Sequence, residues 1–538
     1  MGALSVRARV EVRPGAPYER LADPLTLECV SGSEFARARF ATGWNDTAAL
    51  TDLARDKLRP LPAALVEALR DYHVRLGAPA ASLAALDRLA RGEAVAAVAG
   101  QQPGPLGGPL YALHKAASAV GMAARVAART GIPCVPLFWT HGEDSDFPEI
   151  RSITVGDTAL ALHDLALPEG IHREGTLIGG FPVGPVAALT EQALALWRGH
   201  PAHDAVARLC HRALEGARDL GEAHSALMLG LFGARGLVVV DPRLPAFRAA
   251  AREIIDRYLG RAEALSTLAR AAGATLAERL GHAPLSDAAL ASFVFAIDDG
   301  SRHKLSIDEA RARPRAAPLT PSVALRPVVQ DGVLPTVAMA CGPGELAYLA
   351  QLREVFEALE VRAACPVPRF AATWLPPAAT ALQEAAGAEP WEVVVATDAV
   401  LKAHAERLIP QDLRDQLEAA RVDLTARLGR FAHASTRVDA SLPQMVESAR
   451  GKVDYQFARL LDGLAGKVRH RLERDHPDWL RLRYYLSPGD RAQERRLASL
   501  EPVAWRGPGL APELCDLAEE HAAALERGDW RHYLVDLT

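Results

Sequence analysis

The sequence lacks a long apolar run, a surplus of basic charge and any closely spaced pair of cysteines. No apolar stretch approaches the roughly 18–20 residues that span a bilayer, and the charged N-terminus, MGALSVRARVEVRPGAPYER, has no signal-peptide core. With a net charge of -5, the chain has no broad basic footprint for nucleic acid. These absences predict a cytoplasmic protein that binds neither a membrane nor nucleic acid.

The six cysteines are scattered through 538 residues without a CxxC pair. Neither a disulfide framework nor a structural zinc site is therefore expected, and no metal site is predicted. The GxSxG, HExxH and protein-kinase motifs are also missing, which argues against serine hydrolases, zinc proteases and kinases.

Short apolar runs followed by polar turns and amphipathic helices are what the sequence does contain. This pattern occurs in residues 94–130, 132–150, 236–259 and 334–359, after about ninety mostly helical residues. It predicts an α/β core over residues 1–400 with a parallel sheet, whose ligand site lies beyond the carboxyl ends of the strands. Residues 156–230 and 260–322 are too long for simple connections and are expected to be insertions with their own helices.

The pattern changes after residue 400. Leucines recur at heptad-like spacing from Leu413 to Leu428, and a similar pattern runs from Phe457 to Leu472, with HASTRVDASLP (433–443) between them. This predicts an antiparallel coiled-coil hairpin over residues 401–485. Residues 486–538 are expected to return to the core.

The first candidate site is the stretch VAGQQPGPLGGPLYALHK, from Val98 to Lys115. A strand, a glycine-rich loop and a helix N-terminus can bind an anion, but the spacing matches neither GxGxxG nor GxxxxGK[ST]. Three prolines also remove N–H donors that a phosphate would use. A rigid turn and a substrate loop that holds Gln101 and Gln102 remain equal alternatives.

Two further stretches carry polar groups next to predicted strands. WTHGEDSDF (139–147) places acids at a strand's carboxyl end, where they could hold an amine or Mg²⁺ or cap a helix. In residues 326–348, RPVVQDGVLP precedes a strand and CGPGELAY includes its end. Arg326 could bind a carboxylate or phosphate, or could pair with Asp331 to brace the loop. Lys304, in GSRHKLS, is a weaker phosphate candidate.

Taken together, the chain resembles the family of the bacillithiol biosynthesis cysteine-adding enzyme, a cysteine ligase. The resemblance rests on GQQPGPLGGPLYALHK, FWTHGEDSDFPEI and PSVALRPVVQDGVLPTVAMACGPGELAYLAQL, with support from LFGARGLVVVD and SPGDRAQER. It implies a Rossmann-like core with inserted connecting segments, similar in plan to class I aminoacyl-tRNA synthetases, together with a coiled-coil domain and a homodimer. It also implies that cysteine is joined through its carboxyl group to the amine of glucosaminyl malate, with ATP as co-substrate and Mg²⁺ as a possible helper.

The resemblance assigns roles to residues of the three stretches. Those expected in catalysis are Glu143, Asp144, Asp146, His114 and Lys115. Those expected to bind substrate or nucleotide are Gly100, Gln101, Gln102, Gly104, Gly107, Gly108, Tyr111, Trp139, His141, Arg326, Gln330, Asp331, Gly342, Pro343, Gly344 and Glu345. The carboxylates would orient the cysteine amine or accept a proton, and Lys115 and Arg326 would hold phosphates.

The sequence departs from the family pattern at a few positions. Ser145 stands where the family motif GEDHDF has histidine, and His141 lies four residues earlier. Ala99-Gly100 replaces Thr-Gly, and Cys341 stands where a small residue is usual. Two other functions therefore remain open, a ligase that joins a different amino acid and amine, and a non-catalytic coiled-coil scaffold. An adenylate and an acyl-phosphate route are both possible.

Overall fold

The computed structural model describes residues 4–13, 24–386, 402, 405–475 and 477–537. They form two compact units, Met1–Pro376 together with Asp490–Thr538, and Pro377–Gly489. The sequence predicts boundaries at residues 400 and 485. The second unit begins earlier and includes helix α17 (Pro377–Ala386), while residue 400 itself lies outside the described residues.

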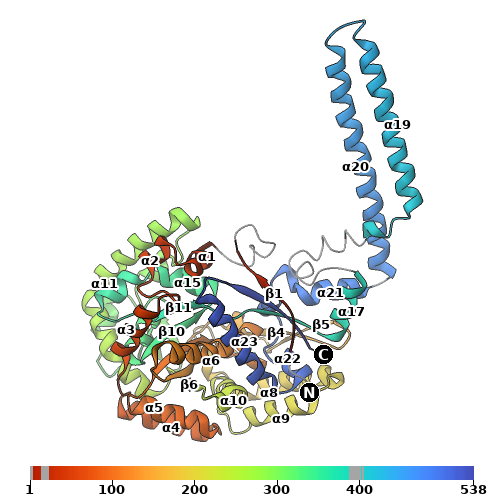
Figure 1. The fold of residues 1–538 in the computed structure, drawn as a ribbon. Coiled ribbons are helices and arrows are strands. Elements are labelled where there is room, and N and C mark those ends of the chain that lie inside the picture. The colour runs from red at the N-terminus through yellow and green to blue at the C-terminus, as the bar shows by residue number, and fades with distance from the viewer. Residues whose placement is uncertain (1–3, 14–23, 387–401, 403–404, 476, 538) are drawn as a thin grey trace. The chain divides into compact units, whose positions relative to one another are not determined.

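A parallel sheet of five strands lies at the centre of the first unit, as far as the chain is described (Figure 1). The strands follow the order β11-β10-β2-β3-β6, and every neighbouring pair is parallel. Their bounds are β2 Val95–Gln101, β3 Cys134–Thr140, β6 Val238–Val240, β10 Thr336–Cys341 and β11 Cys365–Pro368. This arrangement confirms the predicted α/β fold.

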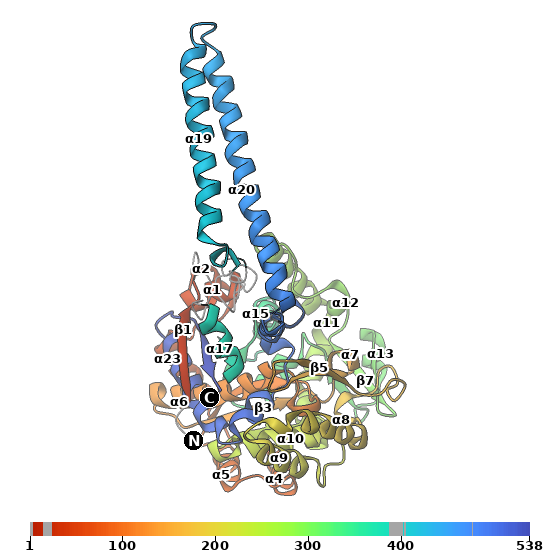
Figure 2. The same cartoon turned by 90° about the vertical axis from the view of Figure 1, so that its right-hand side faces the viewer.

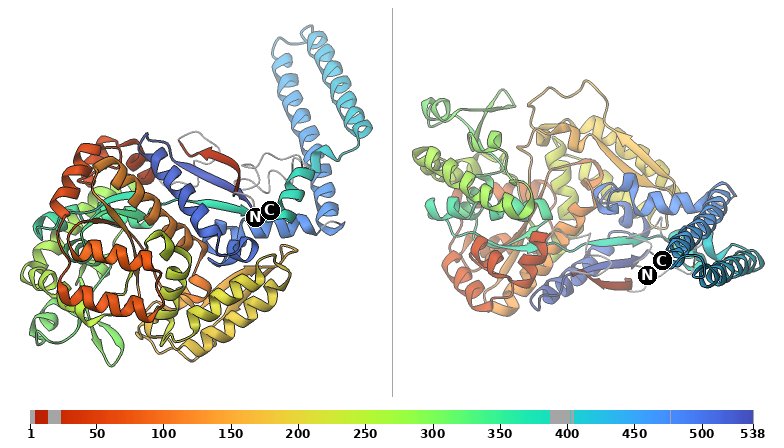
Figure 3. Two further views of the ribbon diagram at one scale, coloured as in Figure 1. Left: turned by 60° about the horizontal axis from the view of Figure 1, so that its bottom comes forward. Right: turned by 90° about the horizontal axis from the view of Figure 1, so that it is seen from above.

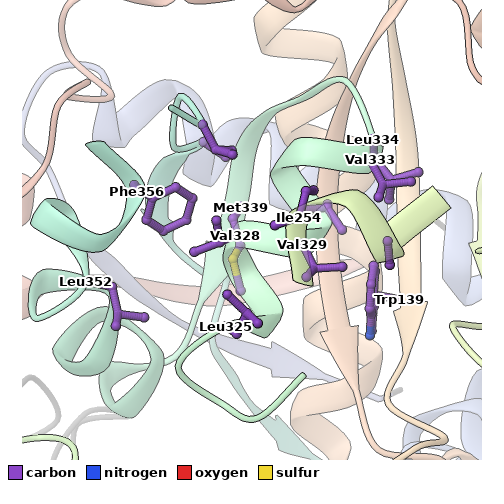
Figure 4. Close-up of a cluster of buried hydrophobic side chains, with 14 of the residues drawn as sticks. Trp139, Ile254, Leu325, Val328, Val329, Val333, Leu334, Met339, Leu352 and Phe356 are labelled. Atoms are coloured by element: carbon purple, nitrogen blue, oxygen red, sulfur yellow. The ribbon is translucent and has the colours of Figure 1, made fainter. Parts of the chain in front are cut away.

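Helices cover both faces of this sheet. All seven residues of β2, VAAVAGQ, are buried, and such continuous apolar runs are typical of strands covered on both faces. Helix α6 (Leu110–Thr130) packs against β2 and β3 on one face. Helices α11 (Pro245–Leu280) and α14 (Arg326–Val333) build the core on the other face, where Figure 4 shows Trp139 near residues of both helices.

The two long connections contain structure of their own. Between residues 152 and 232, a hairpin of β4 (Ser152–Gly156) and β5 (Leu162–Ala166) is followed by helices α8 (Val183–Leu196), α9 (His203–Leu214) and α10 (Leu220–Phe232). Residues 260–322 form more than the expected helices, because β8 (Ser301–Lys304), β7 (Val294–Asp298) and β9 (Leu319–Pro321) make an antiparallel sheet. The turn between β7 and β8 is Asp299-Gly300, both with positive φ. An Asp-Gly hairpin turn of this kind is a sequence signal that the prediction overlooked.

The described ends of the chain pair in a separate sheet. Strand β1 (Ser5–Glu11) is antiparallel to β13 (Arg531–Asp536), which is parallel to β12 (Ala372–Leu375) (Figure 3). The other helices of this unit are α1 Pro24–Ser31, α2 Glu34–Arg39, α3 Thr47–Lys57, α4 Ala63–Arg75, α5 Ala80–Ala90, α7 Phe147–Ile150, α12 Asp287–Leu290, α13 Ile307–Ala312, α15 Pro343–Ala350, α16 Arg353–Ala358, α22 Glu501–Arg506 and α23 Leu510–Leu525.

The second unit consists mainly of two long helices that lie side by side (Figure 2). These are α19 (Gln411–Ser435) and α20 (Leu442–Asp475), followed by α21 (Asp478–Leu486). Several large apolar side chains of the pair are exposed, namely Leu413, Val422, Leu424, Phe431, Met445, Tyr455, Leu460 and Leu461. In the described part of the chain, no helix combines the length and apolar character needed to cross a membrane.

Helix α6 also packs closely against α23 at Gly121. A Cβ atom at Gly121 would lie 2.5 Å from backbone atoms of Ala518 and Glu519. We expect Gly121→Ala to force the helices apart and to lower the free energy of unfolding by about 1–3 kcal/mol, measured by urea denaturation. Gly451→Ala in α20 is the control, because nothing lies within 4 Å of its Cβ position. An equal loss in both variants would contradict this account.

Candidate active site at the carboxyl edge of the sheet

The parallel register brings the ends of the central strands to one edge of the sheet. Gln101 of β2 is opposite Thr140 of β3, and Cys341 of β10 is opposite Pro368 of β11. The polar residues that follow these strands include Gln102, His141 and Arg369. From β2 the chain continues to β3 and β6 on one side of the sheet, whereas β10 and β11 lie on the other side. The direction in which strands are added therefore reverses between β2 and β10. Ligands of open α/β sheets bind at such a switch point.

Lys115 joins the two sides of the switch point. Its ammonium group donates to the carbonyl oxygen of Gly100 at 2.9 Å and to Oε1 of Gln101 at 3.3 Å. It also forms an ion pair of 2.7 Å with Glu345, whose carboxylate accepts a hydrogen bond from the Gly342 amide. Lys115 is 5% exposed, so this predicted residue bridges the glutamine loop and the Gly342–Glu345 loop from inside.

Tyr111 lies one helical turn before Lys115 and completes this part of the site. Its hydroxyl oxygen accepts a hydrogen bond of 3.1 Å from Nε2 of Gln101. Its ring lies 5.9 Å from the Lys115 ammonium nitrogen and 5.7 Å from the guanidinium carbon of Arg369. Burial raises the pKa of Tyr111 to about 12, so the phenol stays protonated between two cations.

Asp144 holds the acidic loop against the glutamine loop. Its Oδ2 accepts a hydrogen bond of 2.7 Å from Gln102, and its Oδ1 lies 3.5 Å from the Arg302 guanidinium. Burial works to raise the pKa of Asp144, but the hydrogen bond from Gln102 and the charges of Arg302 and Arg326 outweigh it and lower the pKa. Asp144 is therefore ionised at neutral pH.

Glu143 and Asp146 lie in different surroundings. Glu143 is buried, accepts a hydrogen bond of 2.7 Å from Arg248 and a second one from the Thr320 hydroxyl. Burial raises its pKa, although Arg248 and Thr320 oppose the shift. Asp146 is exposed at the start of α7. Glu143 thus fixes the acidic loop to the protein interior, while Asp146 is on the solvent-exposed part of the same loop.

Arg326 is the cation of this cluster with the fewest partners. It starts helix α14, and within the described chain its guanidinium has no carboxylate at ion-pair distance, whereas Lys115, Arg302 and Arg369 each have one. Burial works to lower its pKa, but its interaction with the Tyr348 hydroxyl and the charges of Asp144 and Glu345 outweigh burial and raise it. A cation at a helix N-terminus opposes the helix dipole, so local stability does not explain Arg326.

The glycine-rich loop itself is closed by another segment. Gly104, Gly107 and Gly108 are buried, and Ser499 contacts this loop through hydrogen bonds to the carbonyl oxygens of Gly107 and Gly108. Gly107 and Gly108 have φ angles of 83° and 74°, which glycine adopts without strain. These glycines therefore let the loop pack against residues 497–499, and they do not form an open phosphate cradle in this structure.

The structure separates several predicted residues from the cluster. Trp139 is 1% exposed and packs edge-to-face on Phe247 in the core. Gln330 and Asp331 are buried at the opposite edge of the sheet, where Asp331 accepts hydrogen bonds from Thr336 and from the Ala364 amide. Arg326 lies near the site but the other two do not, because helix α14 runs from one edge to the other.

His114 has both ring nitrogens occupied. Nε2 accepts a hydrogen bond of 3.0 Å from the Trp374 indole, which can only donate. Nδ1 therefore carries the proton and faces Glu494 at 3.1 Å. Burial lowers the pKa of His114 although Glu494 opposes the shift, so this histidine is a neutral bridge rather than a group available to substrate.

Two arginines of the cluster were missed by the sequence reasoning. Arg302 lies on β8, two residues before Lys304, which the sequence reasoning considered instead. Arg369 directly follows β11 and pairs with Glu494. The expectation that polar residues after parallel strands gather at one edge applies to it equally well. In the described part of the chain, no group of three or more His, Cys, Asp or Glu side chains is placed to hold a metal ion.

Comparison with known proteins identifies relatives along most of the chain. The family model described as bacillithiol biosynthesis BshC, N-terminal Rossmann-like domain, matches residues 23–370. A protein of Koribacter versatilis named "Putative cysteine ligase BshC" is 30% identical over 469 residues, which cover 84% of this chain and 87% of the relative. A protein of Symbiobacterium thermophilum with the same name is 30% identical over 521 residues, covering 88% and 90%.

Proposed function

Because the chain belongs to the bacillithiol biosynthesis BshC family, we propose that its carboxyl-edge cluster activates cysteine with ATP and joins it to the amine of glucosaminyl malate. A free carboxylate does not form an amide unaided, so activation must place a phosphate or an adenylate on the cysteine carboxyl. The observation that carries the proposal is the partly buried Arg326, which has no carboxylate at ion-pair distance within the described chain and lies close enough to Asp144 and Arg302 to shift their pKa values.

The existing partners of each charged side chain suggest its role in the proposed reaction. Arg326 would bind the phosphate that develops charge during activation, with Lys115 behind it. Asp144, ionised and on the same side, would hold the cysteine ammonium group. Mg²⁺ would arrive with the nucleotide. The described residues provide Asp144 and Glu345 as nearby carboxylates, but both are already bound to protein groups.

A homodimer and a cytoplasmic location form part of the same proposal. The exposed apolar side chains of α19 and α20, among them Leu424, Phe431 and Leu460, support an interface between copies of the hairpin.

The reaction is tested by incubating the protein with ATP, cysteine and glucosaminyl malate, and by detecting the thiol product by mass spectrometry. Reactions that lack one component, or that contain serine in place of cysteine, are the controls. The proposal fails if no product forms while another acid and amine pair turns over.

Asp144→Asn tests the cysteine subsite. The change keeps the hydrogen bond from Gln102 possible but removes the charge, so we expect KM for cysteine to rise about 10–100-fold, which corresponds to the 1.5–3 kcal/mol of a charged hydrogen bond. Asp308→Asn, at an almost fully exposed carboxylate, is the matched control. Unchanged kinetics with cysteine would remove Asp144 from the site.

A further inference from the structure

His141 lies at the carboxyl edge of the sheet, and its ring has no hydrogen-bond partner in the described chain. It follows β3 directly, and in the described chain its imidazole makes no hydrogen bond, in contrast to that of His114. The ring lies against the glycine loop, since a Cβ atom at Gly100 would come within 2.6 Å of Nε2 of His141. Glycine at position 100 thus leaves room for this imidazole beside the switch point.

The charges around His141 keep it neutral. Burial lowers its pKa well below the ordinary value, and Arg326 on α14 and Lys115 on α6 add to the shift. The nearby carboxylates are bound elsewhere, Asp144 to Gln102 and Glu345 to Lys115. A neutral imidazole has one ring nitrogen with a free lone pair, which can accept a proton, whereas Glu143 is held by Arg248 and Thr320.

We propose that His141 is the general base of amide formation, which rests on the function proposed above. The amine nitrogen attacks the activated acyl carbon, and the C–N bond forms as the C–O bond to phosphorus-bound oxygen breaks. The phosphate or nucleotide leaves with the electron pair of that bond, and the N–H proton passes to Nε2 of His141. Arg326 and Lys115 lower the pKa of His141, and the negative charge of a phosphate bound next to them would offset this effect. The imidazole therefore becomes more basic when the activated acid is present.

The test separates activation from attack by the choice of nucleophile. Hydroxylamine is largely unprotonated at neutral pH and traps activated carboxylates as hydroxamates without the help of a base. With ATP and cysteine, His141→Ala and His141→Asn should form cysteine hydroxamate at the wild-type rate. With glucosaminyl malate, amide formation should fall about 10²–10⁴-fold, and added imidazole should restore part of it in the alanine variant.

A second variant moves the ring without removing it. Gly100→Ala places a methyl group on Nε2 of His141, so it should cause the same selective loss of amide formation. The double variant with His141→Ala should lose no more than His141→Ala alone, because both changes act through one group.

Two outcomes would overturn the role of His141. Amide formation at the wild-type rate in His141→Ala would show that the base lies elsewhere, and equal loss of hydroxamate and amide would show that the residue serves binding or folding. If the wild-type protein forms neither cysteine hydroxamate with hydroxylamine nor the amide with glucosaminyl malate, the proposed function itself fails. That result is distinct from a failure of the role of His141.

Discussion

Replacing Arg326 by alanine should lower kcat/KM of the complete ligation by about 10²–10³-fold, the usual loss when one preorganised donor to a developing charge is removed. Arg326 has no carboxylate at ion-pair distance within the described chain. Its guanidinium contacts the Tyr348 hydroxyl but, among the described residues, no carboxylate, so it can still bind an anion, unlike that of Arg369, which is held by Glu494.

The stability of the same variant distinguishes a functional from a structural role. Arg326 starts a helix with a positive charge, against the helix dipole, and it lies near the charge of Arg302. Alanine removes both repulsions but also the attraction of Asp144 and Glu345, which helps raise the pKa of Arg326. The two effects oppose each other, so the melting temperature should change little while activity is lost.

Arg326→Lys and Arg315→Ala complete the comparison. Lysine keeps the charge but not the planar pair of donors, so an intermediate loss is expected if the anion is bound by two oxygens. Arg315 is 79% exposed and serves as the control arginine. Full activity of Arg326→Ala, or loss of activity together with unfolding, would contradict a direct role in phosphate binding.

The proximity of several predicted residues has a simple topological cause. Parallel strands end at the same edge, so any polar residue just after a predicted strand becomes a neighbour of the others. Gln102, Asp144 and Glu345 are brought together in this way, and the periodic pattern was enough to place them. Arg369 obeys the same rule and could have been included.

The positions of the predicted residues that lie away from the cluster have equally local causes. Side chains alternate along a strand, so Trp139 shares the core face with Val135 and Leu137. Gln330 and Asp331 are only four and five residues from Arg326, yet a helix rises about 1.5 Å per residue and carries them away from the site. The partners Arg369 and Glu494 are 125 residues apart, and no local pattern predicts that pairing.

Glu494→Gln should give the largest loss of stability, because Glu494 neutralises an arginine inside the protein. It accepts a hydrogen bond of 2.7 Å from Nη1 of Arg369, pairs with Nη2 of the same residue, and faces Nδ1 of His114. Arg369 is 7% exposed. Breaking such a pair while one charge stays buried costs about 3–5 kcal/mol, and calorimetric melting would measure it.

A double variant shows whether the buried charge causes this loss. Replacing both Arg369 and Glu494 by methionine removes the two charges together, and replacing a buried pair by apolar groups is often neutral. The double variant should therefore be more stable than Glu494→Gln. A double variant that is less stable than Glu494→Gln would show that the pair itself contributes the stability.

The pH dependence of the free energy of unfolding below pH 5 provides an independent check that Glu494 is ionised in the folded chain. Burial works to raise the pKa of Glu494, but Arg369 and His114 lower it far below the ordinary glutamate value. A carboxylate with a depressed folded-state pKa contributes stability above its unfolded pKa, about 4.3, and the contribution is lost as the pH falls below that value. The wild-type protein should therefore lose stability more steeply than Glu494→Gln between pH 5 and more acid conditions. Parallel curves for the two proteins would show that Glu494 is not ionised in the folded chain.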